Sequence, residues 1–187
     1  MNLDKILTKK RDSALIRASL QGNQKAFSKL ISYYKKRVKV LGMSFFKNET
    51  DTEDFIQEVF IKAYTNLKKF RGDSSFPTWL TSIAYNTAVN AKTRRKEYLP
   101  ISDEDNLEDT GLTPEKNEIR KLTVLAVRDA VKDLPEKYKI CVELYFFYDN
   151  SHAEISEITG EGINTIKSHI FRAKKILREK LRGYYEE

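Results

Sequence analysis

Apolar residues recur along most of this chain at intervals of three and four, the spacing of an amphipathic α-helix. Before residue 97 the pattern predicts about four helices and shows no alternation typical of a strand. The second of these helices carries the longest apolar stripe: Phe27, Leu30, Ile31, Tyr34, Val38, Leu41 and Phe45. Such a stripe needs apolar partners, which the neighbouring helices supply, so the pattern predicts an all-α fold.

Residues that favour helix starts precede several of the predicted helices. They are Asp12, Asn23, the capping boxes Thr50–Glu53 and Ser151–Glu154, and Pro77 at a first helical position. Residues 3–11 show charge but no clear apolar period, so the first helix is expected to begin near Asp12.

The third and fourth predicted helices carry polar groups beside their apolar faces. On the third, Asp51, Asp54, Gln57 and Glu58 form an acidic, hydrogen-bonding surface next to Phe60. The aromatic loop 70–80 follows, and the fourth helix then presents amides and cations. Such groups read base edges and phosphates, and aromatic rings stack on bases. The candidate nucleic-acid contacts are Phe70, Phe76, Trp79, Asn86, Asn90, Arg94, Arg95 and Lys96.

Each of these features also has a plain structural interpretation. The rings of the aromatic loop fit a helical core, with Trp79 more often buried than in contact with a ligand. Acidic residues stabilise any helix start and cations any helix end, so both charged stretches fit solvated helix termini.

Two short helices around Gly160 lie near the C-terminus and match a helix-turn-helix. The second, expected from Asn164, buries Ile166, Ile170, Ala173, Leu177 and Leu181. The polar and basic residues off this stripe would enter a major groove or contact phosphates: Asn164, Thr165, Lys167, Ser168, His169, Arg172, Lys174 and Lys175.

Charge divides the 187-residue chain into three parts. Residues 1–96 carry a net +12, residues 97–118 a net −7 and residues 119–187 a net +2. The middle part also has two prolines and no sustained period, so it is expected to be a linker. We therefore predict two small helical domains, 1–96 and 119–187, joined by an acidic linker, with a polyanion as partner.

Several classes of function are not supported by the sequence. Cys141 is the one cysteine and His152 and His169 are the two histidines, far apart, so neither a disulfide nor a metal-ligand cluster is expected. No glycine-rich phosphate loop or G-x-S-x-G elbow occurs, so we expect no enzyme, cofactor or small-molecule substrate. The polar stretch 1–11 is unlike a signal peptide, and a cytoplasmic protein is expected.

Two groups of motifs resemble bacterial sigma factors, above all the small extracytoplasmic-function (ECF) subfamily. Residues 51–60 and 76–80 resemble region two. Residues 134–138, 153–155, 165–168 and 172–177 resemble region four. The chain departs from the family pattern at Tyr85, Asn90, Ser156, Glu161 and His169, which bears on the promoter that is read and on the start of the recognition helix.

The resemblance implies a factor that binds core RNA polymerase and directs promoter recognition, strand opening and transcription initiation. Asp51, Asp54, Gln57, Glu58 and Phe60 would dock on the clamp helices of the largest subunit, and the second domain on the flap. The surface from Phe70 to Lys96 would hold the minus-ten element, and that from Asn164 to Lys175 the minus-thirty-five element. An anti-sigma factor is expected as a further partner.

Two other hypotheses stay open from the sequence. One is a helix-turn-helix regulator that acts without polymerase, against which the acidic surface around Gln57 argues, because DNA would repel it. The other is a degenerate sigma-like protein that sequesters a regulator, against which Asn86, Arg94 and Arg95 argue.

Overall fold

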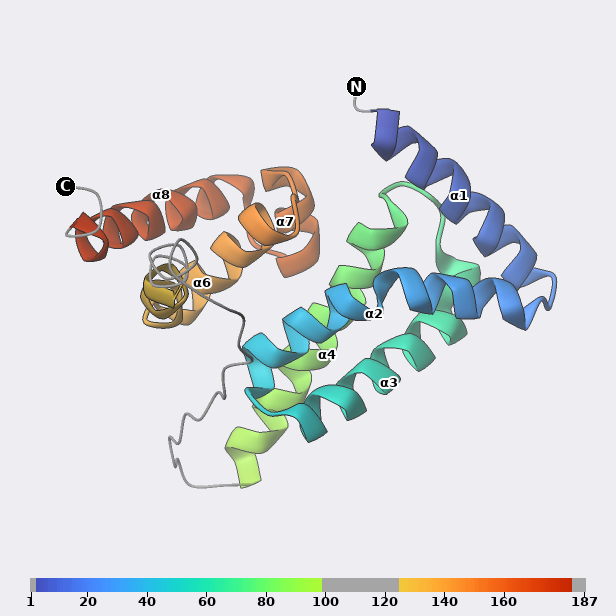
Figure 1. Cartoon of the computed structure of the whole chain (residues 1–187), viewed down its shortest axis with the longest axis horizontal. Coiled ribbons are helices and arrows are strands. Elements are labelled where there is room, and N and C mark those ends of the chain that lie inside the picture. The colour runs from blue at the N-terminus through green and yellow to red at the C-terminus, as the bar shows by residue number, and fades with distance from the viewer. Residues whose placement is uncertain (1–2, 99–124, 183–187) are drawn as a thin grey trace, which may run out of the picture. The chain divides into compact units, whose positions relative to one another are not determined.

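The computed structural model describes residues 3–98 and 125–182, with the backbone alone at Leu3, Lys5 and residues 95–98 (Figure 1). Within these ranges the regular structure is entirely helical, which confirms the predicted all-α class. The chain divides into two compact units, 1–107 and 108–187, and the two described ranges belong to one unit each. The predicted linker lies, from residue 99 onward, outside the described residues.

In the first unit, helix α2 (Gln24–Phe46) packs against all three of its neighbours (Figure 1). These are α1 (Leu3–Leu20), α3 (Glu49–Asn66) and α4 (Phe76–Tyr98). A 3-10 turn, η1 (Leu67–Lys69), follows α3, and α3 also packs on α4. The predicted stripes meet in one core, which includes Leu30, Val38, Leu41, Val59, Ala63, Leu80, Ala84 and Ala88.

The helix starts agree with the sequence in part. Asn23 caps α2, and Ser151 and Glu154 form a capping box, as predicted. The predicted box at Thr50 is wrong, because α3 begins at Glu49 and the Asn48 side chain accepts the Asp51 backbone N–H at 2.8 Å. Helix α4 begins at Phe76 rather than Pro77, and the Ser75 hydroxyl accepts the Thr78 N–H.

Asp12 is not a helix cap, contrary to the prediction. Helix α1 starts nine residues earlier, and Asp12 lies buried within it. Its carboxylate accepts hydrogen bonds from the buried Tyr34 hydroxyl and, at 2.8 Å, from Arg11. Burial, together with the bond to Asp12, raises the pKa of Tyr34 well above its ordinary value. The carboxylate thus joins α1 to α2, a tertiary role that helical periodicity does not reveal.

Helix α2 packs tightly against side chains of α3 at Gly42. A Cβ atom added there would lie 2.8 Å from Cδ1 of Phe55 and 2.9 Å from Cγ2 of Thr52. Both neighbours are buried, so neither side chain has free space into which it can move. The glycine sets the distance between the two helices that present the candidate sites.

We expect Gly42→Ala to lower the free energy of unfolding by about 1–3 kcal/mol, the usual cost of overpacking a core. This cost exceeds the gain of up to about 1 kcal/mol from alanine's helix preference. Urea unfolding followed by the fluorescence of Trp79 reports on this unit. Ser28→Ala, on the exposed side of the same helix, controls for propensity. A Gly42→Ala protein as stable as the wild type would contradict the close approach.

The second unit consists of short helices packed around its last one. Residues 125–132 are helical, and α6 (Glu136–Val142), the π-helical turn η2 (Glu143–Phe147), α7 (His152–Thr159) and α8 (Ile163–Lys180) follow. Helix α8 packs against α6 and α7. Val131, Leu134, Val142 and Ala173 form one apolar cluster, and Ile155, Ile158, Ile166 and Ile170 are also buried. No helix in the described ranges is long and apolar enough to cross a membrane.

Candidate protein and nucleic-acid interfaces

The predicted acidic surface of α3 faces solvent. Asp54, Gln57 and Glu58 are exposed and Asp51 is half-buried, whereas Phe60 is only 5% exposed. Phe60 therefore supports this surface mainly from the core, with only a small part of its ring exposed. Its neighbour Ile61 is 64% exposed and lies on the exposed side of the helix. We define the α3 surface as Asp51, Asp54, Gln57, Glu58 and Ile61.

A groove of about 650 Å³ runs between α2 and α3 beside Gln57. Apolar side chains from both helices line it: Phe27, Ile31, Ile56, Phe60, Ile61 and Tyr64. The ion pair between Lys35 and Glu53, at 3.1 Å, borders it. Exposed apolar side chains beside charged ones are typical of a protein-binding site.

The sequence analysis missed Ile61 and Tyr64 as parts of this groove. Both are large apolar residues that fall outside the buried stripe Phe55, Ile56, Val59, Phe60 and Ala63. Their positions outside that stripe could have identified them from the sequence, because an apolar residue there is exposed on an amphipathic helix. The positions of Ile61 and Tyr64 around the helix, and not their residue type, distinguish them from the core residues.

A second hollow, of about 480 Å³, lies between α3 and α4. Asp51, Asp54 and Glu58 line it together with Arg94 and three apolar residues. Glu58 also pairs with Lys62 at 2.6 Å, one helical turn away. The acidic residues of α3 thus lie beside the basic end of α4, so the predicted protein and nucleic-acid contacts are neighbours in space.

The three aromatic residues of the predicted minus-ten surface form one cluster. Phe70, Phe76 and Trp79 contact each other with ring centroids 5.2–5.8 Å apart. Phe76 is 3% exposed and packs on Tyr34, whereas Phe70 and Trp79 are half-buried. Phe76 is therefore a core support, and only the other two rings have faces available for stacking.

Along α4, Asn86, Asn90 and Arg94 are exposed and repeat every four residues, so they share one face of the helix. Trp79 lies at the start of the same helix. The side chains of Arg95 and Lys96, the remaining predicted contacts, lie outside the described residues. An exposed row of two amides and a guanidinium ending near an aromatic cluster suits a single strand of nucleic acid.

The turn of the helix-turn-helix follows Gly160, whose φ of 74° is readily accessible to glycine. Ser156, at a position where the family usually has alanine, donates a hydrogen bond of 2.6 Å to the carbonyl of Glu161. The hydroxyl of Thr159 accepts the Glu161 N–H. Helix α8 then begins at Ile163, one residue before the predicted start. The serine at 156 thus adds a hydrogen bond that closes the turn, and this bond uses the backbone rather than the side chain of Glu161.

The exposed face of α8 carries most of the predicted minus-thirty-five contacts. Asn164, Thr165, Lys167, Arg172, Lys174 and Lys175 are exposed and Ser168 is half-buried. Arg172 donates to the Tyr138 hydroxyl at 3.4 Å, and Lys174 lies over the rings of Tyr145 and Phe146. Phe171, which the sequence analysis missed, is 71% exposed. Phe171 follows Asn164 by seven residues, about two helical turns, so its sequence position already predicts that it lies in the middle of this face.

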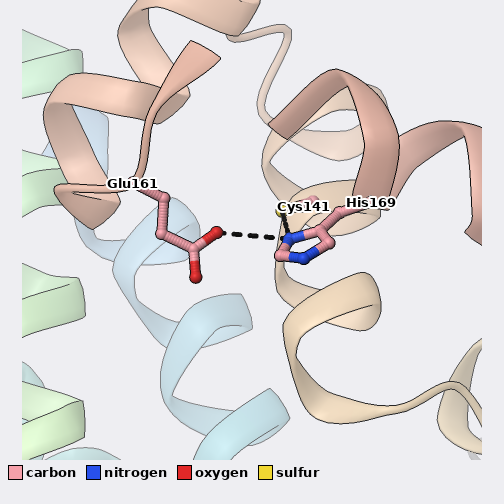
Figure 2. A group of neighbouring side chains, drawn as sticks. All are labelled: Cys141, Glu161 and His169. Atoms are coloured by element: carbon pink, nitrogen blue, oxygen red, sulfur yellow. Dashed lines mark hydrogen bonds and ion pairs between the residues drawn. The ribbon is translucent and has the colours of Figure 1, made fainter. Parts of the chain in front are cut away.

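His169 does not lie on the groove-facing side as expected. Its side chain is 13% exposed and turns inward, where Nδ1 lies 3.2 Å from Oε2 of Glu161 and 3.8 Å from Sγ of Cys141 (Figure 2). The Tyr138 ring packs against it at 5.2 Å. Position 169 falls between the exposed and buried faces of α8, and its ring lies against Cys141, Glu161 and Tyr138.

Cys141 is buried. Burial is the main cause that raises the pKa of its thiol to about 11, and the nearby negative charge of Glu161 also contributes. The sequence analysis expected no metal-ligand cluster because these residues are far apart along the chain. The fold instead brings Cys141, Glu161 and His169 together, with their ligand atoms within 4.8 Å of one another.

Comparisons with known proteins agree with this architecture. Residues 30–98 match the family model described as Sigma-70 region 2, and residues 125–177 match Sigma-70, region 4. The ECF RNA polymerase sigma-E factor of Haemophilus influenzae is 36% identical over 91% of this chain and 95% of its own. The RNA polymerase sigma-H factor of Pseudomonas aeruginosa is 32% identical over 97% and 100%.

Among solved structures, the fold resembles the sigma factor RpoE in complex with the anti-sigma factor NepR from Bartonella quintana. The TM-score is 0.67 at 22% identity, over 87% of this chain and 99% of that one. The helical units, the helix-turn-helix and these matches together indicate the class of a bacterial transcription initiation factor. The chain belongs to the sigma-70 family, and within it to the ECF RNA polymerase sigma factors.

Proposed function

We propose that this sigma factor engages core RNA polymerase through the α3 surface and the adjoining groove. The observation that carries the proposal is the exposure of Gln57 and Ile61 beside an apolar groove on the region-two unit. Clamp helices of the largest polymerase subunit would lay an amphipathic face on this surface. The second unit would dock on the flap and present α8 to the minus-thirty-five element.

The domain roles follow the predicted boundaries. Residues 1–96 bind the polymerase clamp and the minus-ten element, and residues 119–187 bind the minus-thirty-five element. The acidic segment 97–118 would pass through the polymerase near the RNA path, where its net charge of −7 stands in for RNA. In this role the protein binds and positions, while the polymerase performs the chemistry.

Strand opening is the energetically demanding step. Unstacking and flipping a base costs a few kcal/mol, and stacking on an aromatic ring returns about 1–3 kcal/mol per base. One captured base therefore roughly offsets its own cost. Phe70 and Trp79 supply the stacking faces, and Asn86 and Asn90 the edge contacts. Net opening then depends on phosphate contacts and on the polymerase, so the free protein should bind DNA weakly and with strong salt dependence.

An anti-sigma factor is the proposed regulator, because a sigma factor of the same fold has been solved in complex with one. The groove between α2 and α3 is an apolar surface that such a partner would cover. Binding to polymerase and promoter DNA would require a cytoplasmic location, which we therefore propose.

The test of this function is gel filtration with purified core RNA polymerase, followed by transcription from a library of promoter fragments. We expect co-elution and promoter-dependent transcripts. Failure of the folded protein to bind core enzyme would refute the proposal and favour a regulator that acts on DNA alone.

We expect Lys167→Ala to weaken binding of the polymerase complex to a minus-thirty-five duplex by about 10-fold. Lys167 is exposed near the start of α8, where recognition helices reach base edges, and a lost base contact costs about 1–3 kcal/mol. The measurement is a duplex titration at fixed salt. Lys132→Ala, in the same unit but outside α8, is the matched control. If both variants bind the duplex with equal affinity, Lys167 does not lie on the recognition face.

A further inference from the structure

The second unit holds a cluster that promoter recognition does not explain. Cys141 comes from α6, Glu161 from the turn after α7 and His169 from α8 (Figure 2). Their Sγ, Oε2 and Nδ1 atoms lie close together, with separations of 3.8 Å and 3.2 Å from the imidazole nitrogen. Three different elements therefore bring a soft, a borderline and a hard metal ligand to one place.

The spacing fits one tetrahedral ion. With zinc–sulfur bonds of about 2.3 Å and zinc–nitrogen or zinc–oxygen bonds of about 2.0–2.1 Å, neighbouring ligand atoms lie about 3.4–3.6 Å apart. The separations of 3.2 Å and 3.8 Å fall on either side of this range. The third separation, between the thiol and the carboxylate, is at most 4.8 Å, so these two side chains would have to move closer for all three atoms to reach bonding distance.

The ring nitrogen Nδ1 lies between a carboxylate oxygen and a sulfur. It carries at most one hydrogen, so it cannot donate to both neighbours at once. A cation at the point where the three atoms converge would accept one lone pair from each of them. A thiolate, a carboxylate and Zn²⁺ also sum to zero charge, which suits a site with a buried side.

Access and coordination number are consistent with such an ion. The Cys141 side is closed, whereas the Glu161 side chain is 30% exposed and opens the cluster to solvent. Three protein ligands leave the fourth position for a water molecule. We propose that Cys141, Glu161 and His169 form a binding site for one zinc ion, which ties the helix-turn-helix turn to α6 and α8.

The test is a cobalt titration of the chelator-treated full chain, because Co²⁺ reports thiolate coordination by a ligand-to-metal charge-transfer band. We expect this band together with visible bands of a tetrahedral ion, and displacement of both by Zn²⁺. Zn²⁺ should also raise the melting temperature of the second unit by several degrees, reversibly with chelator. A wild-type titration without the charge-transfer band would overturn the proposal irrespective of any variant.

Variants then assign the ligands. Cys141→Ser should remove the charge-transfer band, and His169→Gln and Glu161→Gln should each weaken cobalt binding by about 10-fold or more. His152→Gln and Glu157→Gln change the same residue types in the same unit but outside the cluster, and they should bind as the wild type does. Circular dichroism without metal verifies each fold. Unchanged affinity in folded Glu161→Gln and His169→Gln would refute the assigned site.

Discussion

Replacing Gln57 and Ile61 together by alanine is expected to weaken binding to core RNA polymerase by about 30-fold or more. Truncating one interface hot spot costs about 2 kcal/mol or more, which corresponds to that factor. Ile61 is 64% exposed, so this cost arises in the complex and not in folding. The free energy of unfolding should therefore stay at the wild-type value. Interferometry on immobilised core enzyme measures the affinity, and urea unfolding measures the stability.

Ile61 is the better target than Phe60, although both line the groove. Phe60 is buried, and its truncation would cost about 3–5 kcal/mol of stability. Loss of binding in that variant would not distinguish an interface from an unfolded domain. Gln21→Ala with Val40→Ala is the matched control, since both residues are exposed in the same unit and neither lines the groove. A folded Gln57–Ile61 double variant with wild-type affinity would place the polymerase contact elsewhere.

The double change Asn86→Ala with Asn90→Ala is expected to reduce open-complex formation by about 30-fold or more. Each lost base-edge contact costs about 1–3 kcal/mol, and unstacking leaves no surplus to offset it. Both residues are exposed, so folding should be unaffected. Permanganate reactivity of unpaired thymines in the minus-ten element measures opening, and a filter assay measures retention of the closed complex, which should be unchanged.

Salt dependence separates this effect from phosphate binding. Neither asparagine carries charge, so the slope of log affinity against log salt concentration should match that of the wild type in the double variant. Arg94→Ala should reduce the size of this slope by about one. Ser13→Ala with Gln21→Ala changes two exposed polar residues on another part of the first unit and serves as control. Equal loss of closed and open complexes in the asparagine variant would show that these residues do not act on strand opening.

Much of the fold is encoded locally. The stripe from Phe27 to Phe45 and the stripe of α8 predict buried helix faces, because burial selects the same three- and four-residue spacing that the helix imposes. Asn23 and the Ser151–Glu154 box were predicted because a cap acts within one helical turn. Asp12 was misread for the same reason: its partner Tyr34 lies on another helix.

The candidate site residues also divide into those that the local sequence pattern predicted correctly and those that it did not. Periodicity distinguishes exposed from buried residues only to within one position on a helix. For this reason Phe60, Phe76 and His169 were predicted as contacts although their side chains are largely buried. Ile61 and Phe171 were missed because an apolar residue is assumed to be core until its surroundings are known.

The all-α class, the charge division of the chain and the region-two and region-four motifs can all be read from the sequence without a structure. These features depend on residues close together in the chain, so no knowledge of packing is needed to find them. Tertiary packing was needed to show which residues of α3 and α8 face solvent, and that Gly42 packs tightly against α3. It also placed Cys141 beside Glu161 and His169, because ligand geometry depends on where separate helices cross and not on their separation in sequence.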